Sequence, residues 1–193
     1  MGKSYSEVGG PSMCFNGIKF YQLNWFLEHT LEIFPDKNGP WTGNIAAFVD
    51  HQKLQARTTP IIVKVGNVYL LYNVAKDYNK DVVEKRDHVT VVQGEPRSCD
   101  SCDSNLLGAI HETERPELTA NIDFDVTRSI TFEVCGASLQ DGIDVKLVSI
   151  RLEGQASTCQ PLETSSPTSA PVLPTPDPTP PPSPRPRDRK SVV

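Results

Sequence analysis

The segment PIIVKVGNVYLLYNV, residues 60–74, consists of two short apolar runs joined by Gly66 and Asn67. Both runs are rich in β-branched and aromatic residues, as strands are. The first run alternates in character, so that Ile62 and Lys64 would lie on one face of an extended strand. A Gly-Asn pair suits the positive φ values that two-residue hairpin turns require. The segment therefore predicts an antiparallel β-hairpin with its turn at these two residues.

Similar segments recur along the chain, separated by turn residues. The strand-like segments are NIAAFVD (44–50), HVTVVQ (88–93), NLLGAIH (105–111), ANIDFDV (120–126), SITFEVC (129–135) and DVKLVSIRL (144–152). The turn residues between strands include Asn38, Gly39, Pro40, Gly94, Gly136, Asp141 and Gly142. Many short strands at near-regular spacing favour an antiparallel β-sandwich over a βαβ fold. The segment LNWFLEHTLEIF (23–34) fits a short helix or two strands equally well.

Composition and charge bound the class of protein. The chain has 193 residues and a net charge of −5, which argues against a dedicated nucleic-acid binder. The basic run RPRDRK (185–190) lies among prolines and is interpreted as a solvated linker. No stretch reaches the 18 or so apolar residues of a membrane span. The opening residues also lack the basic start and apolar run of a signal peptide.

The end of the chain differs in composition from the rest. Between Pro161 and Pro186 lie 11 of the 17 prolines, mixed with serine and threonine. Such a sequence favours extended polyproline II and acts as a stiff spacer. Residues 155–193 are therefore predicted to be a disordered linker or stalk. Its composition fits an O-glycosylated stalk and an unmodified disordered segment about equally well.

The five cysteines are numerous for a cytosolic domain of this size. Cys99 and Cys102 have a CxxC spacing in a polar stretch, where a loop disulfide is favoured over half of a zinc site because no second ligand pair follows. Cys14, Cys135 and Cys159 are further candidates for structural disulfides. The pairing is left open, and the cysteine usage favours an oxidising, extracellular compartment.

No complete active site can be read from the residue types and spacings. HETER (111–115) begins like the zinc-protease motif HExxH, but Arg115 stands where the second histidine should be. One imidazole cannot supply the two ligands of that motif, so His111 is interpreted as a surface residue at a strand end. Acidic pairs such as Asp123 and Asp125 lack the spacing of an EF-hand loop. The sequence predicts no catalytic and no metal-binding residue in this chain.

Several separate blocks nevertheless resemble one family. MGKSYSEVGGPSMCFNGIKFYQLNW (1–25) is similar to the MGxSYS…GPxMCFNxxKxxQLGW segment of the gametolysin family of zinc metallopeptidases, which degrade algal extracellular matrix. The similarity continues through NGPWTGNIAAFVD (38–50) and through residues 60–92, where the family typically shows LYLxYNRAKxxN followed by xEKxDxVTVV. SNLLGAI (104–110) and residues 129–152 resemble its closing strands. The sequence departs from the family pattern at Asn24 and Asp77, which replace usual glycines, and at Val74, which replaces a usual arginine.

This resemblance implies a specific domain organisation. Residues 1–40 would be the C-terminal edge of a metzincin-like catalytic domain, residues 41–154 a β-rich domain, and residues 155–193 the linker. Met1 would correspond to the methionine of the turn beneath the catalytic zinc, a structural residue and not a ligand. The family's HExxH helix precedes the MGxSYS segment, so the zinc-binding part is expected upstream of Met1. This chain alone is therefore expected to bind no cofactor and to lack peptidase activity.

The resemblance also implies partners and location. The full-length parent would be extracellular or in the cell wall, and would act on extracellular-matrix or cell-wall glycoproteins. The alternative is a non-catalytic binding or structural β-sandwich module on a Pro-rich stalk. In that case aromatic side chains sharing one exposed face would contact glycan; the candidates are Trp25, Trp41, Tyr69, Tyr72 and Tyr78. Neither the substrate nor the oligomeric state can be inferred from the sequence.

Overall fold

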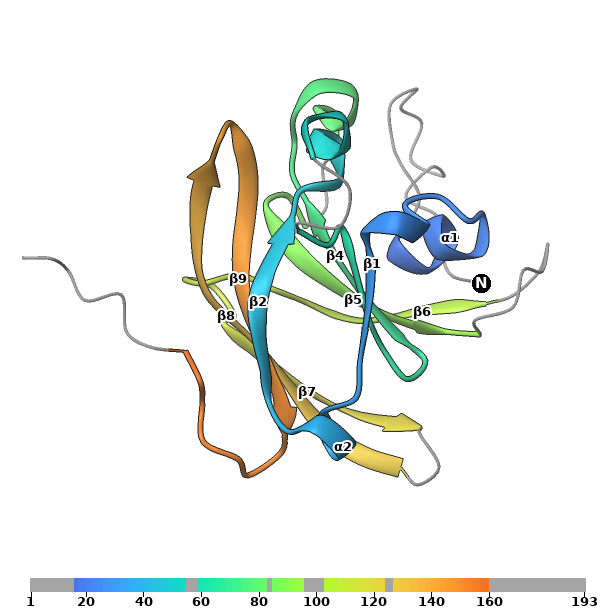
Figure 1. Cartoon of the computed structure of the whole chain (residues 1–193), viewed down its shortest axis with the longest axis vertical. Helices are drawn as coiled ribbons and strands as arrows, with labels where there is room; N and C mark the ends of the chain where they lie inside the picture. The colour runs from blue at the N-terminus through green and yellow to red at the C-terminus, as the bar shows by residue number, and fades with distance from the viewer. Residues whose placement is uncertain (1–15, 55–58, 83–84, 96–102, 124–126, 160–193) are drawn as a thin grey trace, which may run out of the picture. The chain divides into compact units, whose positions relative to one another are not determined.

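The computed structural model describes residues 16–54, 59–82, 85–95, 103–123 and 127–159 (Figure 1). All of these lie in the first of two compact units of the chain, Met1–Leu162; the second unit is Glu163–Val193. The candidate residues Met1, Cys14, Cys99 and Cys102 fall outside the described residues. Within the described residues, no helix is long and apolar enough to cross a membrane.

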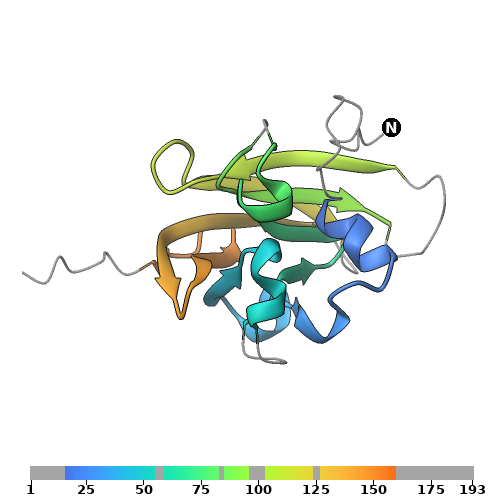
Figure 2. The same cartoon turned by 90° about the horizontal axis from the view of Figure 1, so that it is seen from above.

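The strands form two sheets, which confirms the predicted mainly β, sandwich-like fold (Figure 1, Figure 2). The five-stranded sheet has the order β1 (Thr30–Ile33), β3 (Ile62–Val65), β4 (Val68–Asn73), β5 (His88–Gly94) and β6 (Ser104–Ile110). The four-stranded sheet has the order β2 (Trp41–Ala46), β9 (Ile143–Leu152), β8 (Thr127–Gln140) and β7 (Glu117–Asp123). Because apolar residues of both sheets are fully buried, among them Leu70, Ile110 and Phe132, the two layers share one core.

Two tight hairpins form where the sequence predicts turns. Val65 pairs with Val68 across the Gly66-Asn67 turn, and Gly66 has a φ of +57°. Gln140 pairs with Ile143 across the Asp141-Gly142 turn, in which both residues have positive φ. Glycine adopts this backbone conformation without the steric penalty that a Cβ brings, and aspartate tolerates it. The local sequence therefore determines both hairpin registers.

One pair of described strands departs from the antiparallel expectation. β1 pairs with β3 in parallel, with Thr30 opposite Ile62. Between these two strands the chain runs through α2 (Pro35–Asn38), through β2 in the other sheet, and through the 3₁₀ helix η3 (Phe48–Lys53). A crossover of this length allows a strand to return in the same direction, which a tight turn cannot do.

Several local interpretations of the sequence need correction. The NIAAFVD segment is strand only to Ala46, and its second half begins η3. Residues 23–34 are neither a helix nor two strands, since they contain the 3₁₀ turn η2 (Leu27–His29) followed by the single strand β1. Gly94 and Gly136 lie within strands and not between them. A Cβ at Gly94 would lie 2.5 Å from Ile18, so this glycine is explained by close packing under a helix.

That helix is α1 (Gly17–Gln22), and it covers one end of the five-stranded sheet (Figure 1). The Asn16 side chain caps it by accepting a hydrogen bond of 3.1 Å from the Lys19 N–H. Ile18 and Phe20 are buried and belong to the same core as the strands. The described part of residues 1–40, which the resemblance assigns to a catalytic-domain edge, thus packs into the β-sandwich through α1 and β1.

Candidate functional site

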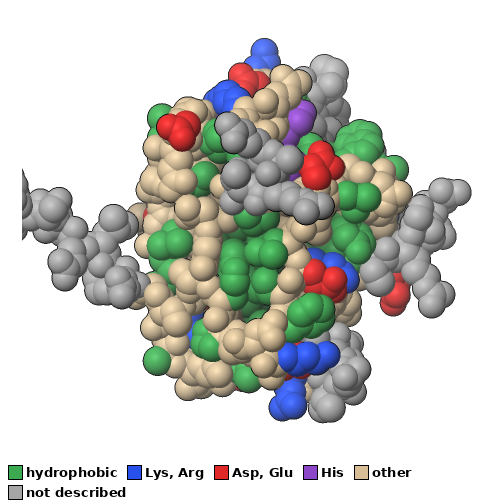
Figure 3. Space-filling model, viewed as in Figure 1, with side chains coloured by type: hydrophobic (Ala, Val, Ile, Leu, Met, Phe, Trp, Pro, Cys, Tyr) green, Lys and Arg blue, Asp and Glu red, His purple; other side chains and the backbone are tan. Residues whose placement is uncertain are grey.

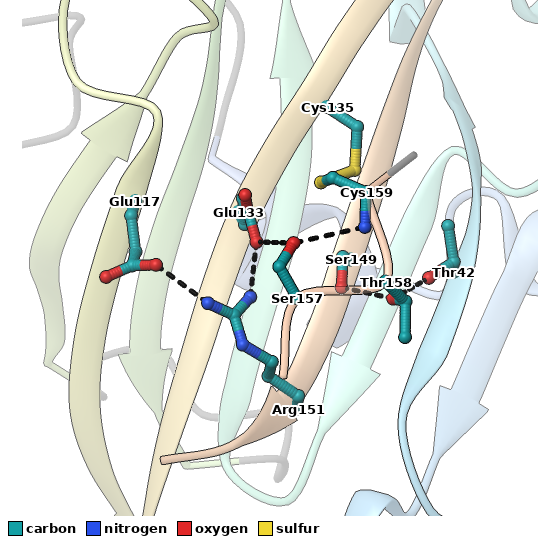
Figure 4. The surroundings of a disulfide bond; sticks show 9 residues. All are labelled: Thr42, Glu117, Glu133, Cys135, Ser149, Arg151, Ser157, Thr158 and Cys159. Carbon is teal, nitrogen blue, oxygen red and sulfur yellow. Dashed lines mark hydrogen bonds and ion pairs between the residues drawn. A yellow bond between two sulfur atoms is a disulfide. The ribbon is translucent and has the colours of Figure 1, made fainter. Parts of the chain in front are cut away.

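Two of the predicted disulfide cysteines are brought together by the fold. Cys135 and Cys159 form a disulfide with a Cα–Cα distance of 5.1 Å (Figure 4). Cys135 was expected to end a strand, but it lies in the middle of β8, where the register with β9 shifts between Val134 and Gly136. An extra residue at such a β-bulge lacks a cross-strand partner and changes the local direction of the strand. Cys135, at this bulge, is therefore the residue to which Cys159, after β9, is bonded.

Hydrogen bonds also hold the residues just before Cys159 against the four-stranded sheet (Figure 4). The Ser157 hydroxyl donates to Glu133 at 2.7 Å, and the Thr158 hydroxyl bonds to Ser149 at 2.7 Å and also to Thr42. Thr42 belongs to β2, Glu133 to β8 and Ser149 to β9, so contacts reach three strands. Residues 155–159, which the sequence assigns to the linker, are thus bonded to the β-sandwich where the structure describes them.

Arg151 is the centre of an ion network under this segment (Figure 4). Its guanidinium binds Glu117 of β7 at 2.8 Å and also Glu133 of β8, and its Nε donates to the Gln155 carbonyl at 3.1 Å. Only 7% of Arg151 is exposed. A buried guanidinium requires acceptors for its fixed set of donors, and two carboxylates and a carbonyl provide them here. The network ties β7, β8 and β9 together.

A second charged cluster surrounds Asp50, whose side chain is fully buried. Its carboxylate accepts hydrogen bonds from Lys53 at 2.5 Å, from Lys76 at 3.0 Å and from the Asp144 backbone N–H at 3.0 Å. Burial raises the pKa of Asp50, but these three donors together outweigh burial and hold the pKa below its ordinary value. A hydrogen bond to Asp144 raises the pKa of Lys76, against the effect of burial, and Asp50 adds to it. The cluster joins η3, the loop after β4, and β9.

His111 comes directly after β6 and forms an isolated bridge with Arg115. Its ring lies beside that of His88, with centroids 4.9 Å apart. The Nδ1 atom of His88 donates to the Arg86 carbonyl at 2.6 Å, and its Nε2 faces Glu114 at 3.2 Å. Each ring nitrogen of His88 therefore lies against an oxygen acceptor.

Glu112 and Lys146 complete the surroundings of the two histidines. Lys146 donates to Glu112 at 2.5 Å and lies over the Tyr72 ring at 5.3 Å from its centroid. Burial raises the pKa of Glu112, but the hydrogen bond from Lys146 and further contacts outweigh it and lower the pKa overall. The Glu112 carboxylate is thus already paired with an ammonium group. In the part of the chain that the structure describes, no three His, Cys, Asp or Glu side chains are grouped so as to hold a metal ion.

The aromatic residues named for glycan contact do not share an exposed face. Tyr69 is fully buried and Tyr72 is 6% exposed, so that expectation is wrong for both. Trp41 packs against the core and lies over Gly43, where an added Cβ would be 2.4 Å from the indole ring. Trp25 and Tyr78 remain exposed, at 50% and 43%. They lie at opposite ends of a chain of ring contacts that runs through Phe20 and Phe48.

Sequence reasoning missed Asp50, Lys76 and Arg151. Their only local signal is a charged residue beside a strongly apolar run, such as Asp50 at the end of IAAFVD. We also compared the chain with known proteins. No protein-family model, no curated protein and no solved structure matches the chain.

Proposed function

We propose that this chain is the C-terminal part of a gametolysin-like zinc metallopeptidase acting on extracellular-matrix or cell-wall glycoproteins. In this proposal residues 16–159 form a non-catalytic β-sandwich module. The described residues do not fit a zinc site, and the zinc ligands and general base would belong to the HExxH helix upstream of the MGxSYS segment. The Cys135–Cys159 disulfide is consistent with an extracellular parent.

The observation that best supports the proposal concerns the two positions where the family usually has glycine. Asn24 has a φ of +58° and Asp77 a φ of +50°. Both values lie in the left-handed region, which glycine adopts freely and other residues adopt at a cost. The glycines of the family pattern thus coincide with positions in this chain where the backbone favours glycine. Val74, the third departure, is 8% exposed and packs in the core.

This correspondence predicts the effect of restoring the glycines. We expect Asn24→Gly and Asp77→Gly each to raise the free energy of unfolding by about 0.5–1 kcal/mol, because relief of the left-handed strain exceeds the added entropy of the unfolded chain. Urea denaturation of the full chain measures this. Lys80→Gly is the matched control, because Lys80 has a φ of −58° and the same change there should lower stability. A loss of stability in both test variants would remove this support for the proposal.

The direct test is the nucleotide sequence upstream of the Met1 codon. We expect the transcript that encodes this chain to continue upstream in frame and to encode HExxH followed by the residues that lead to MGKSYS. Sequencing of full-length transcripts from their 5′ ends decides this. A transcript with a stop codon immediately before Met1 would count against the proposal and favour the binding or structural module. For that module, Trp25 and Tyr78 are the exposed aromatic candidates among the described residues.

A further inference from the structure

The strand β1 lies at one edge of the five-stranded sheet. Among the described strands it pairs only with β3, so its other side has no strand partner. An edge strand presents alternate backbone N–H and C=O groups on its outer side, and these can pair with an added strand. Figure 3 shows hydrophobic side chains at the surface in the middle of this face, over the region between β2 and β1 of Figure 1. Apolar side chains therefore reach the surface near β1 in this view.

A hollow of about 460 Å³ lies at the beginning of β1. It is lined by Leu27, Glu28, His29, Thr30, Leu31, Thr59 and Pro60. Three of these side chains are apolar, and Leu27 is 49% exposed. The hollow therefore adjoins both the sheet edge and exposed apolar surface, which is how domains that add a peptide strand combine backbone pairing with a side-chain pocket.

His29 lines this hollow and directly precedes β1. The residue is 7% exposed, and its Nδ1 atom is buried without a hydrogen-bond partner. The backbone of His29 accepts a hydrogen bond of 2.8 Å from the Ile61 N–H, which fixes the residue at the start of the β1–β3 pair.

Charge defines the ligand further. Glu28 lines the hollow and is exposed, and Glu32 of β1 is also exposed, although it is paired with Lys64 at 2.5 Å. We infer that the outer edge of β1 binds an extended peptide segment of another protein, in which an apolar side chain enters the hollow and a flanking Lys or Arg faces Glu28. The backbone of the peptide would extend the sheet by one strand. This inference does not depend on the proposed peptidase parent.

The test measures binding of a short blocked peptide, TVKVKVT, labelled with fluorescein, to the full chain by fluorescence anisotropy. Two control peptides separate the contributions. TVEVEVT reverses the charge, and TVKVKVT methylated on alternate backbone nitrogens cannot pair with the β1 edge. We expect both controls to bind at least about tenfold more weakly, which corresponds to the loss of one well-placed interaction.

Protein variants locate the site. Leu27→Asp should abolish binding, and Glu28→Lys should weaken binding of TVKVKVT while improving binding of TVEVEVT. Leu139→Asp is the matched control, because Leu139 is 66% exposed in β8 of the other sheet and should have no effect. All three side chains are exposed, so the variants should fold, and circular dichroism verifies this.

Several outcomes would overturn the inference. The first is the absence of saturable binding up to about 1 mM peptide, the weak end of measurable specific affinity. The second is that the methylated peptide binds as tightly as TVKVKVT. The third is that Leu139→Asp weakens peptide binding as much as Leu27→Asp does. Sedimentation that shows a dimer dissociated by Leu27→Asp, without peptide binding, would instead assign the edge to a second copy of the chain.

Discussion

Replacing Asp50 by Ala is expected to lower the free energy of unfolding by about 2–4 kcal/mol, because two ammonium groups and a backbone N–H would lose their shared buried acceptor. The two lysines are partly exposed, at 46% for Lys53 and 31% for Lys76, so water can compensate them in part. The Asp144 N–H contributes the remainder of the cost. Chemical denaturation at neutral pH measures the difference.

The same carboxylate predicts a pH dependence whose sign follows from the direction of its pKa. The pKa of Asp50 in the folded chain lies below the ordinary value of an aspartate side chain. Its contribution to stability is therefore fully present above about pH 4–5 and is lost as pH falls through the folded pKa. We expect the stability difference between wild type and Asp50→Asn to shrink as the pH is lowered below 4. Glu153→Gln is the control, since Glu153 is exposed. If the stability difference between wild type and Asp50→Asn stays constant with pH, the lowered pKa of Asp50 is contradicted.

Loss of the Cys135–Cys159 disulfide is expected to lower the free energy of unfolding by about 3.5 kcal/mol, the loop-entropy value for a closed loop of this size. The two cysteines are 24 residues apart in sequence. The double variant Cys135→Ala/Cys159→Ala avoids a free thiol and is compared with wild type by urea denaturation.

Reduction of the wild-type chain provides an independent check on the disulfide. The reduced wild type and the double alanine variant should lose similar stability, and the amide protons of residues 155–159 should exchange faster in both. A loss below about 0.5 kcal/mol, the usual scatter of surface substitutions, would contradict a stabilising role.

Those parts of the fold that depend on neighbouring residues could be predicted from the sequence. The turns at Gly66-Asn67 and Asp141-Gly142 form because glycine and its polar neighbour permit the tight reversal between two apolar runs. Strand existence likewise follows from β-branched runs between turn residues. The sequence misplaces strand boundaries where tertiary packing outweighs the local pattern of residues. One example is Gly94, a glycine whose absent side chain is explained by contact with α1.

The interactions that hold the candidate sites together could not be predicted in the same way. Asp50 bonds to Asp144, 94 positions away, and Arg151 bonds to Glu117, 34 positions away. Which charge meets which depends on the order of strands in the two sheets, which periodicity does not determine. The cysteine pairing was open for the same reason, since five cysteines permit many pairings and spacing alone does not select one.

The disulfide at the end of the described segment also has a mechanical consequence. A pulling force on the chain beyond Cys159 does not reach the sheet through Leu152, the last residue of β9. It enters through Cys135, in the middle of β8, the strand that pairs with both β7 and β9. A load applied there acts on many ladder hydrogen bonds at once, whereas a load on the end of β9 would peel them apart one after another. The cross-link thus makes an interior strand of the four-stranded sheet the anchor for the chain that follows Cys159.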